Sequence, residues 1–69
     1  MRYAVVYEKS ENGYAYVPDL PCCIAAGKIY EETVRLITEE IAFYLEGLRE
    51  DGQPIPEPTS VADYVAVAV

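Results

Sequence analysis

The stretch of residues 13–21 constrains the fold of this chain most, because it joins a short aromatic strand to a stop made of two prolines. Tyr14 and Tyr16 alternate with smaller residues, which is the side-chain period of a strand. Proline has no N–H and a fixed φ, so Pro18 and Pro21 are expected to end strand pairing and to leave a stiff, exposed elbow. Nothing nearby supplies a nucleophile, a histidine or a metal cluster, so the stretch predicts a binding surface.

The rest of the chain divides into strands and one helix. We expect strands at 2–8, 13–17 and 22–26, then a helix over 30–50 and a last strand over 61–69. Asn12-Gly13 is a strong hairpin-turn dipeptide between the first two strands. Apolar residues spaced three and four apart mark the helix, with Gly52 as its C′ residue and Ile29 as a poor N-cap.

The order β-β-β-α-β predicts a two-layer α+β fold in a single domain, 1–69, with one helix covering one face of a small sheet. Small residues permit close approach of a helix, so we place four of them under it: Ala4, Val6, Ala15 and Val17. The tyrosines would then lie on the open face: Tyr3, Tyr7, Tyr14 and Tyr16. The opposite arrangement, with the tyrosines under the helix, fits the same alternation.

The composition argues against several classes of function. Twelve acidic residues against five basic ones give a net charge of -7, which disfavours nucleic acid and anionic membranes and attracts a basic partner protein. The same charge would also keep a small domain soluble. Cys22 and Cys23 are adjacent and no histidine accompanies them, so we expect a reducing, cytoplasmic compartment and no metal or other cofactor. We see no secretory leader and no apolar run of about 18 residues.

No catalytic constellation is expected. Neighbouring carboxylates on the helix, such as Glu39 and Glu40, diverge by about 100° and do not share a site. A metal-dependent nuclease would need several converging carboxylates, whereas the first strand offers only Glu8 and the last strand only Asp63. We therefore predict no catalytic residue, and a degenerate nuclease is the weaker alternative.

Two groups of residues are predicted to contact other chains. The chain has 7 tyrosines, and tyrosine suits interfaces, although it is also a good strand former. The predicted partner-binding residues are Tyr14, Tyr16, Pro18, Asp19 and Leu20. The last strand has no Lys, Pro or inward charge to guard an edge, which predicts an oligomer interface at Tyr64, Val65, Val67 and Val69. If that strand instead lay in the middle of the sheet, no oligomer interface would be predicted from it.

Three motifs together make the chain similar to the HicB antitoxin family. They are Gly13-Tyr14-x-x-Val17-Pro18-Asp19-Leu20-Pro21-x-Cys23, Gly27-x-x-x-Glu31-Glu32 and Gly52-x-Pro54-Ile55-Pro56-x-Pro58. The resemblance covers nearly all of residues 3 to 60. It implies a partial ribonuclease-H-like sheet in which the last strand lies at the edge, beside and parallel to the first.

The resemblance also implies a function. A HicB protein binds a small basic HicA-type toxin, a ribonuclease acting on messenger RNA, and covers its active surface; an acidic antitoxin would match it electrostatically. This chain departs from the family at Cys22, where glycine is common, and at Ile29, where a threonine N-cap is common. Many members continue into a DNA-binding domain and this chain ends at Val69, so we do not carry over operator binding. The alternative is a stand-alone structural oligomer without a toxin.

Overall fold

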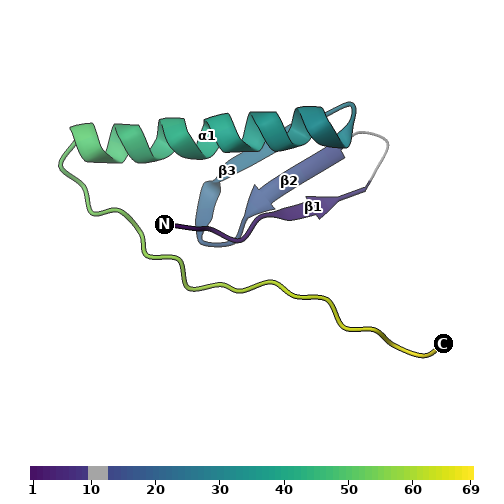
Figure 1. Ribbon diagram of the computed structural model, residues 1–69. Helices are drawn as coiled ribbons and strands as arrows, with labels where there is room; N and C mark the ends of the chain where they lie inside the picture. The colour runs from purple at the N-terminus through teal and green to yellow at the C-terminus, as the bar shows by residue number, and fades with distance from the viewer. Residues whose placement is uncertain (10–12) are drawn as a thin grey trace.

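The computed structural model describes residues 1–9 and 13–69, and shows three strands followed by one helix (Figure 1). The elements are β1 (Val6–Glu8), β2 (Gly13–Val17), β3 (Leu20–Gly27) and α1 (Tyr30–Glu50). The strands form one antiparallel sheet in the order β1-β2-β3, and α1 lies across one face of it. The predicted α+β class with one covering helix is confirmed. Within the predicted hairpin dipeptide, Asn12 lies outside the described residues.

A tight turn that contains Pro18 joins β2 to β3. β2 ends at Val17 and β3 begins at Leu20, which pairs with it, so Pro18 and Asp19 alone make the connection. Pro21 lies inside β3 but has no partner on β2, because the register shifts between Tyr16 and Val17 and pairing resumes at Ile24. Pro21 was expected to end strand pairing; it lies where the pairing is interrupted, and the strand continues beyond it. β3 is an edge strand of this sheet, and an edge strand tolerates a residue without an N–H where that position faces away from the neighbouring strand.

Two side-chain hydrogen bonds hold the start of α1, although its N-cap side chain makes none. Ile29 makes no side-chain capping bond, as the sequence led us to expect. Instead, the Lys28 backbone N–H donates to Oε1 of Glu32 at 3.0 Å, and Oγ1 of Thr33 donates to the carbonyl oxygen of Ile29 at 3.1 Å. Glu31 and Glu32 also place negative charge in the first turn, where the helix dipole favours it.

The end of α1 is a Schellman motif built on Gly52, the predicted C′ residue. Gly52 has a φ of 69°, in the left-handed region that favours glycine. Its N–H donates to the carbonyl oxygen of Arg49 at 3.1 Å, and the N–H of Gln53 donates to that of Leu48 at 2.8 Å. These two bonds satisfy carbonyl groups that the helix itself leaves without partners.

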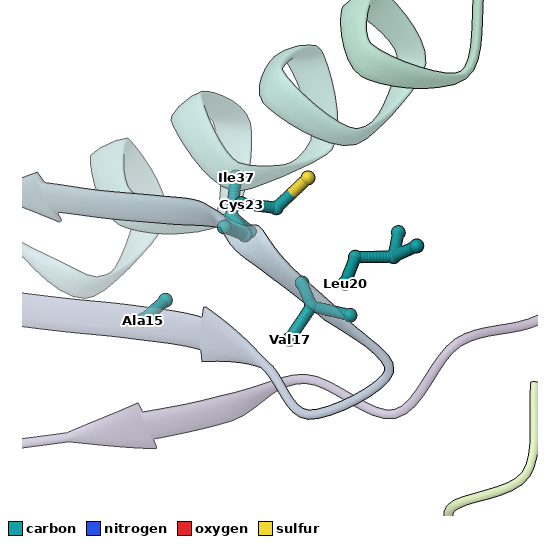
Figure 2. Packing of buried hydrophobic residues seen from close by; sticks show 5 residues of the cluster. All are labelled: Ala15, Val17, Leu20, Cys23 and Ile37. Carbon is teal, nitrogen blue, oxygen red and sulfur yellow. The ribbon is translucent and has the colours of Figure 1, made fainter. Parts of the chain in front are cut away.

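The core lies between α1 and the helix-facing side of β2 and β3 (Figure 2). Its fully buried apolar residues are Ala15, Val17, Leu20, Cys23 and Ile37. Partly buried side chains from residues 3–7, from β3 and from the later turns of α1 pack around this cluster: Tyr3, Val5, Tyr7, Ala25, Ile41, Tyr44 and Leu45. The core is small, as expected for a chain of 69 residues, so each of these contacts carries a large share of the stability.

Two glycines let the first turns of α1 lie close to the sheet. Gly13 and Gly27 are paired across β2 and β3. A Cβ added to either glycine would lie 2.7 Å from Oγ1 of Thr33, which is closer than real Cβ contacts come. Thr33 is itself buried, and its hydroxyl is satisfied by the carbonyl oxygen of Ile29. Glycine is therefore required at both positions by the packing of the helix.

The faces predicted for β2 are confirmed. Ala15 and Val17 lie under α1 with 0% and 1% of their surfaces exposed. Tyr14 and Tyr16 point to the opposite side of the sheet, because side chains alternate along a strand. Small residues at alternate positions were thus a correct sign of the side that the helix covers.

The faces predicted for the first strand are wrong. Val6 is paired with Tyr16 and Tyr7 with Ala15, and paired residues share a face of the sheet. Tyr7 therefore packs against the core, with its ring 5.0 Å from that of Tyr30, and Tyr3 packs there too. Val6 lies on the open face, although Ala4 and Val6 were expected under the helix. A shift of one residue in register exchanges the two faces of a strand, and alternation alone does not reveal that shift.

The last predicted strand is not formed. Residues 53–69 contain no regular secondary structure, so the observed order is β-β-β-α instead of β-β-β-α-β. β1 is also shorter than predicted, at 6–8 instead of 2–8, and β3 is longer, at 20–27 instead of 22–26. A strand is defined by hydrogen bonds to a neighbour, and 61–69 has no such neighbour among the described residues. No helix in the described ranges is long and apolar enough to cross a membrane.

The close approach of Thr33 to Gly27 can be tested by adding a methyl group. Gly27→Ala should lower the free energy of unfolding by about 1–3 kcal/mol, because the new Cβ must displace the start of α1. Gly47→Ala is the matched control, since a Cβ there would meet nothing within 4 Å apart from its chain neighbours and the backbone of its own helix. This helix-interior change should raise stability by about 0.5–1 kcal/mol. Urea titrations of both variants make the comparison, and equal effects would contradict the packing described here.

Candidate functional site

Opposite α1, the sheet presents an aromatic surface, which we call the tyrosine face. Tyr14 and Tyr16 lie side by side on β2, with ring centroids 5.9 Å apart and ring planes tilted by 44°. The strand pairing sets Val6 and Ile24 on either side of Tyr16. Tyr14 is 38% exposed and Ile24 is 54% exposed. The tyrosine face thus consists of Val6, Tyr14, Tyr16 and Ile24, with Pro18 and Pro21 of the turn region at its end.

A shallow groove of about 410 Å³ runs along the tyrosine face to the β2–β3 turn. It is lined by Glu8, Tyr14, Tyr16, Val17, Pro18, Pro21 and Ile24. Glu8 is the one ionisable carboxylate in this set, and the rest are aromatic, aliphatic or proline side chains. Rigid aromatic side chains beside prolines offer a large contact area at little cost in conformational entropy. The groove suits contact with another protein better than binding of a small polar substrate.

Asp19, which the sequence predicts as a partner contact, uses its carboxylate within its own chain. Its Oδ2 accepts the backbone N–H groups of Thr59 at 2.9 Å and Ser60 at 3.0 Å. Its Oδ1 accepts the hydroxyl groups of the same two residues, both at 2.9 Å. We call this arrangement the Asp19 clamp. The bond from the Ser60 N–H contributes most to lowering the pKa of Asp19 to about 2, and the other bonds from Thr59 and Ser60 add to it.

The Asp19 clamp ties residues 59–60 to the turn between β2 and β3. A second tie lies next to it, where the hydroxyl of Tyr3 donates to the carbonyl oxygen of Pro56. Burial raises the pKa of the Tyr3 hydroxyl, with a smaller effect from the nearby carboxylate of Glu57. The stretch after α1 is thus held against the end of the sheet where β1 begins.

Other predicted contact residues have different surroundings. Leu20 is in the core with 1% of its surface exposed, so its side chain does not reach the tyrosine face. It follows the turn directly and is paired with Val17, which also points under the helix. Pro18 is exposed, as predicted, and it lines the groove. The predicted roles of these residues toward a partner stay predictions.

The predicted oligomer-interface residues lie in the C-terminal segment, defined here as residues 61–69. Tyr64 is 99% exposed, and Val65, Val67 and Val69 are all largely exposed. Water therefore surrounds a run of apolar side chains, which is an unfavourable arrangement for an isolated chain. The exposure agrees with a segment that binds another chain, and it does not identify that chain.

The described residues offer little for catalysis. They contain no group of three or more His, Cys, Asp or Glu side chains that could hold a metal ion. Glu8 and Asp63, the two carboxylates considered for a nuclease, line one hollow beside β1 without a third such group. Cys22 is exposed and Cys23 is buried, and neither forms a disulfide. Burial, followed by the carboxylate of Glu40, raises the pKa of the Cys23 thiol, which keeps it protonated and unreactive.

Sequence reasoning missed the Asp19 clamp. Its partners Thr59 and Ser60 are 40 and 41 residues away from Asp19 in the chain. The signal that could have found it is the aspartate in a tight turn together with a Thr-Ser pair after a proline-rich stretch. Each of these features is common alone, and their combination is visible only once the helix returns the chain to the turn.

The comparisons with known proteins identify a family. A family model described as a HicB_like antitoxin of bacterial toxin-antitoxin systems matches residues 3–68. This range takes in every element of the fold, the tyrosine face, the Asp19 clamp and nearly all of the C-terminal segment. No solved structure matches the chain.

Several curated proteins are similar in sequence. The chain is 53% identical over 47 residues to a UPF0150 protein of Helicobacter pylori, which covers 67% of this chain and 65% of that protein. It is 33% identical over 69 residues to a UPF0150 protein of Synechocystis, covering 97% and 87%. It is 35% identical over 66 residues to an uncharacterised 14.9 kDa protein of Haemophilus phage HP1, covering 94% of this chain and 50% of the phage protein. The chain thus spans about half of the phage relative and 65% of the Helicobacter one.

The Asp19 clamp predicts a pH-dependent contribution to stability. The folded-state pKa of Asp19 is lowered from 3.8 to about 2, so its stabilising effect is present above pH 3.8 and is lost as the pH falls through about 2. Asp19→Asn should therefore be less stable than the wild type at pH 7, and the difference should vanish below about pH 2. Urea titrations across this range measure it, with amide hydrogen exchange at Thr59 and Ser60 as a local reading.

Glu57→Gln serves as the control for this experiment, because it neutralises an exposed carboxylate close to the clamp. It should leave the exchange rates of Thr59 and Ser60 unchanged. Rates in Asp19→Asn equal to those of the wild type at pH 7 would contradict the clamp.

Proposed function

This chain belongs to the HicB-like antitoxin family, and on that premise we propose that it binds and masks a small, basic HicA-type toxin, a ribonuclease that cleaves messenger RNA. The family match over residues 3–68 is the observation that carries the proposal. In this proposal the protein acts in the cytoplasm as an inhibitor, needs no cofactor and is not an enzyme. Its effect comes from covering the active surface of the toxin.

The tyrosine face is the surface we propose for this contact. Tyr14 and Tyr16 supply exposed aromatic area on a rigid strand, and Pro18 continues the surface at the turn. Aromatic residues of this kind dominate the binding energy of many protein interfaces. Asp19 and Leu20 do not present their side chains to the partner in this proposal. They fix the shape of the turn next to the tyrosine face, Asp19 through the clamp and Leu20 through its burial. Their effect on a partner would then be indirect.

Charge supports a basic partner. The net charge of -7 produces a negative electrostatic potential around this small protein, which speeds its encounter with a positively charged protein. Such steering weakens as salt screens it, over a distance of about 8 Å at physiological ionic strength. The association rate with a toxin should therefore fall as salt is added, while the aromatic contacts change little.

A second candidate function is a stand-alone structural oligomer, and the C-terminal segment favours self-association in either case. Its exposed apolar residues were predicted as an oligomer interface: Tyr64, Val65, Val67 and Val69. We propose that the working form is a homodimer or a higher oligomer joined through this segment. Burial of these side chains between copies would remove apolar surface from water and stabilise the assembly.

The masking proposal is tested with a purified HicA-type toxin that cleaves messenger RNA. Adding the chain in equal amount should abolish cleavage of messenger RNA by that toxin. Tyr14→Ala and Tyr16→Ala should each weaken binding by about 2 kcal/mol, or roughly thirtyfold in Kd, in isothermal titration calorimetry. Phe43→Ala is the control, since Phe43 is an aromatic that is 79% exposed on α1, away from the sheet. A toxin whose activity persists at full excess of the chain would refute the proposal.

Self-association is tested separately by multi-angle light scattering. The mass should be at least twice the 7.7 kDa of one chain. Val67→Lys should shift the population toward the monomer, because it places a charge inside the proposed contact. Val61→Lys, at the start of the segment, should have a smaller effect. A monomeric wild type at millimolar concentration would rule out the oligomer.

A further inference from the structure

The two ends of the groove on the tyrosine face differ in their chemistry. The end at the β2–β3 turn is lined by Pro18 and Pro21, whose side chains carry no charge. The other end is lined by Glu8, which is exposed and is paired with Tyr14 across β1 and β2. Four residues of strand separate Tyr14 from Pro18, which is about 13 Å. The groove is therefore anionic at one end and apolar at the other.

Glu8 and Tyr14 are neighbours on the open face of the sheet. Directly paired residues place their Cβ atoms about 4.5–5.5 Å apart on the same face. On the other side of Tyr14 the pairing sets Ala26, which is exposed and whose side chain is a single methyl group. Tyr14 itself is 38% exposed. A carboxylate thus lies beside an aromatic ring that a side chain of another molecule can reach.

The carboxylate of Glu8 is not used within its own chain, as far as the described residues show. Both ion pairs found among them lie within α1, and neither includes Glu8. A carboxylate attracts a lysine or arginine side chain by charge and by hydrogen bonding, and the face of an aromatic ring attracts the same cation. The anionic end of the groove therefore has the chemistry of a site for one cationic side chain.

We propose that Glu8 and Tyr14 together bind one lysine or arginine side chain of the toxin, and that this contact determines which partner the tyrosine face accepts. The inference rests on the proposed masking of a basic toxin and adds the short-range contact that selects it. The net charge of -7 attracts any basic protein from a distance, and Glu8 then holds the matching one in a single orientation. A partner bound the other way round would set its cation beside Pro18 and Pro21, which is unfavourable.

The test separates this contact from general attraction by comparing two substitutions that change the net charge equally. Glu8→Gln and Glu50→Gln each remove one negative charge. Glu50 is exposed at the last residue of α1, about 30 Å along the helix from its start, and α1 lies on the opposite face of the sheet from the groove. Glu50→Gln is therefore the matched control.

Surface plasmon resonance with a purified HicA-type toxin measures both variants. Glu8→Gln should raise Kd about tenfold, mainly through faster dissociation, because the bound cation loses its carboxylate. Glu50→Gln should raise Kd by less than about twofold, through slower association, because it weakens only the long-range attraction.

A double-mutant cycle tests whether Glu8 and Tyr14 bind the same cation. Tyr14→Ala alone should weaken binding roughly thirtyfold. Residues that share one contact have effects that do not simply multiply, so combining Tyr14→Ala with Glu8→Gln should weaken binding about a hundredfold, less than the roughly three-hundredfold product of the single effects. Combining Tyr14→Ala with Glu50→Gln should give the product of those two single effects.

The outcomes distinguish this inference from the proposed function. Equal effects of Glu8→Gln and Glu50→Gln on the dissociation rate would overturn the shared cation site and leave the masking of the toxin intact. Simple multiplication of the effects of Glu8→Gln and Tyr14→Ala would do the same. A toxin that does not bind the wild type would overturn both. Circular dichroism of each variant verifies that its fold is retained.

Discussion

The fit between the first turns of α1 and the paired glycines of β2 and β3 determines how the rest of the molecule is arranged. Thr33 lies so close to Gly13 and Gly27 that a single methyl group would not fit. This contact decides which side of the sheet the helix covers, and hence that Ala15 is buried and Tyr14 is exposed. The tyrosine face follows from it, because it is the side that the helix leaves open. A core this small permits few alternative arrangements of its elements.

Much of the fold could be predicted from local patterns. β2 and α1 have the predicted bounds, since alternation and helical periodicity are properties of neighbouring residues. Gly52 ends the helix as expected because its conformation requires glycine. The faces of β1 could not be predicted, because the register between strands depends on the geometry of their connection. The predicted strand at 61–69 depends on a partner, and no local pattern says whether that partner belongs to the same chain.

Part of the candidate site could likewise be predicted from local patterns, and part of it could not. Tyr14, Tyr16 and Pro18 lie together on one surface because they come from one strand and the turn that follows it. Leu20 lies in the core, and Asp19 is engaged with residues that come late in the chain. These two placements arise from tertiary contacts, which residue types alone do not encode. The assignment to an antitoxin family rests on the match over nearly the whole chain.

Asp19 follows Pro18 directly in a connection of two residues, and it also holds Thr59 and Ser60. A ligand that moves the proline must therefore move the point from which the C-terminal segment departs. Free-energy coupling between two such positions acts equally in both directions. Through the carboxylate of Asp19, the binding of a ligand at the β2–β3 turn and the orientation of the C-terminal segment thus depend on each other, although neither a helix nor a strand connects the two.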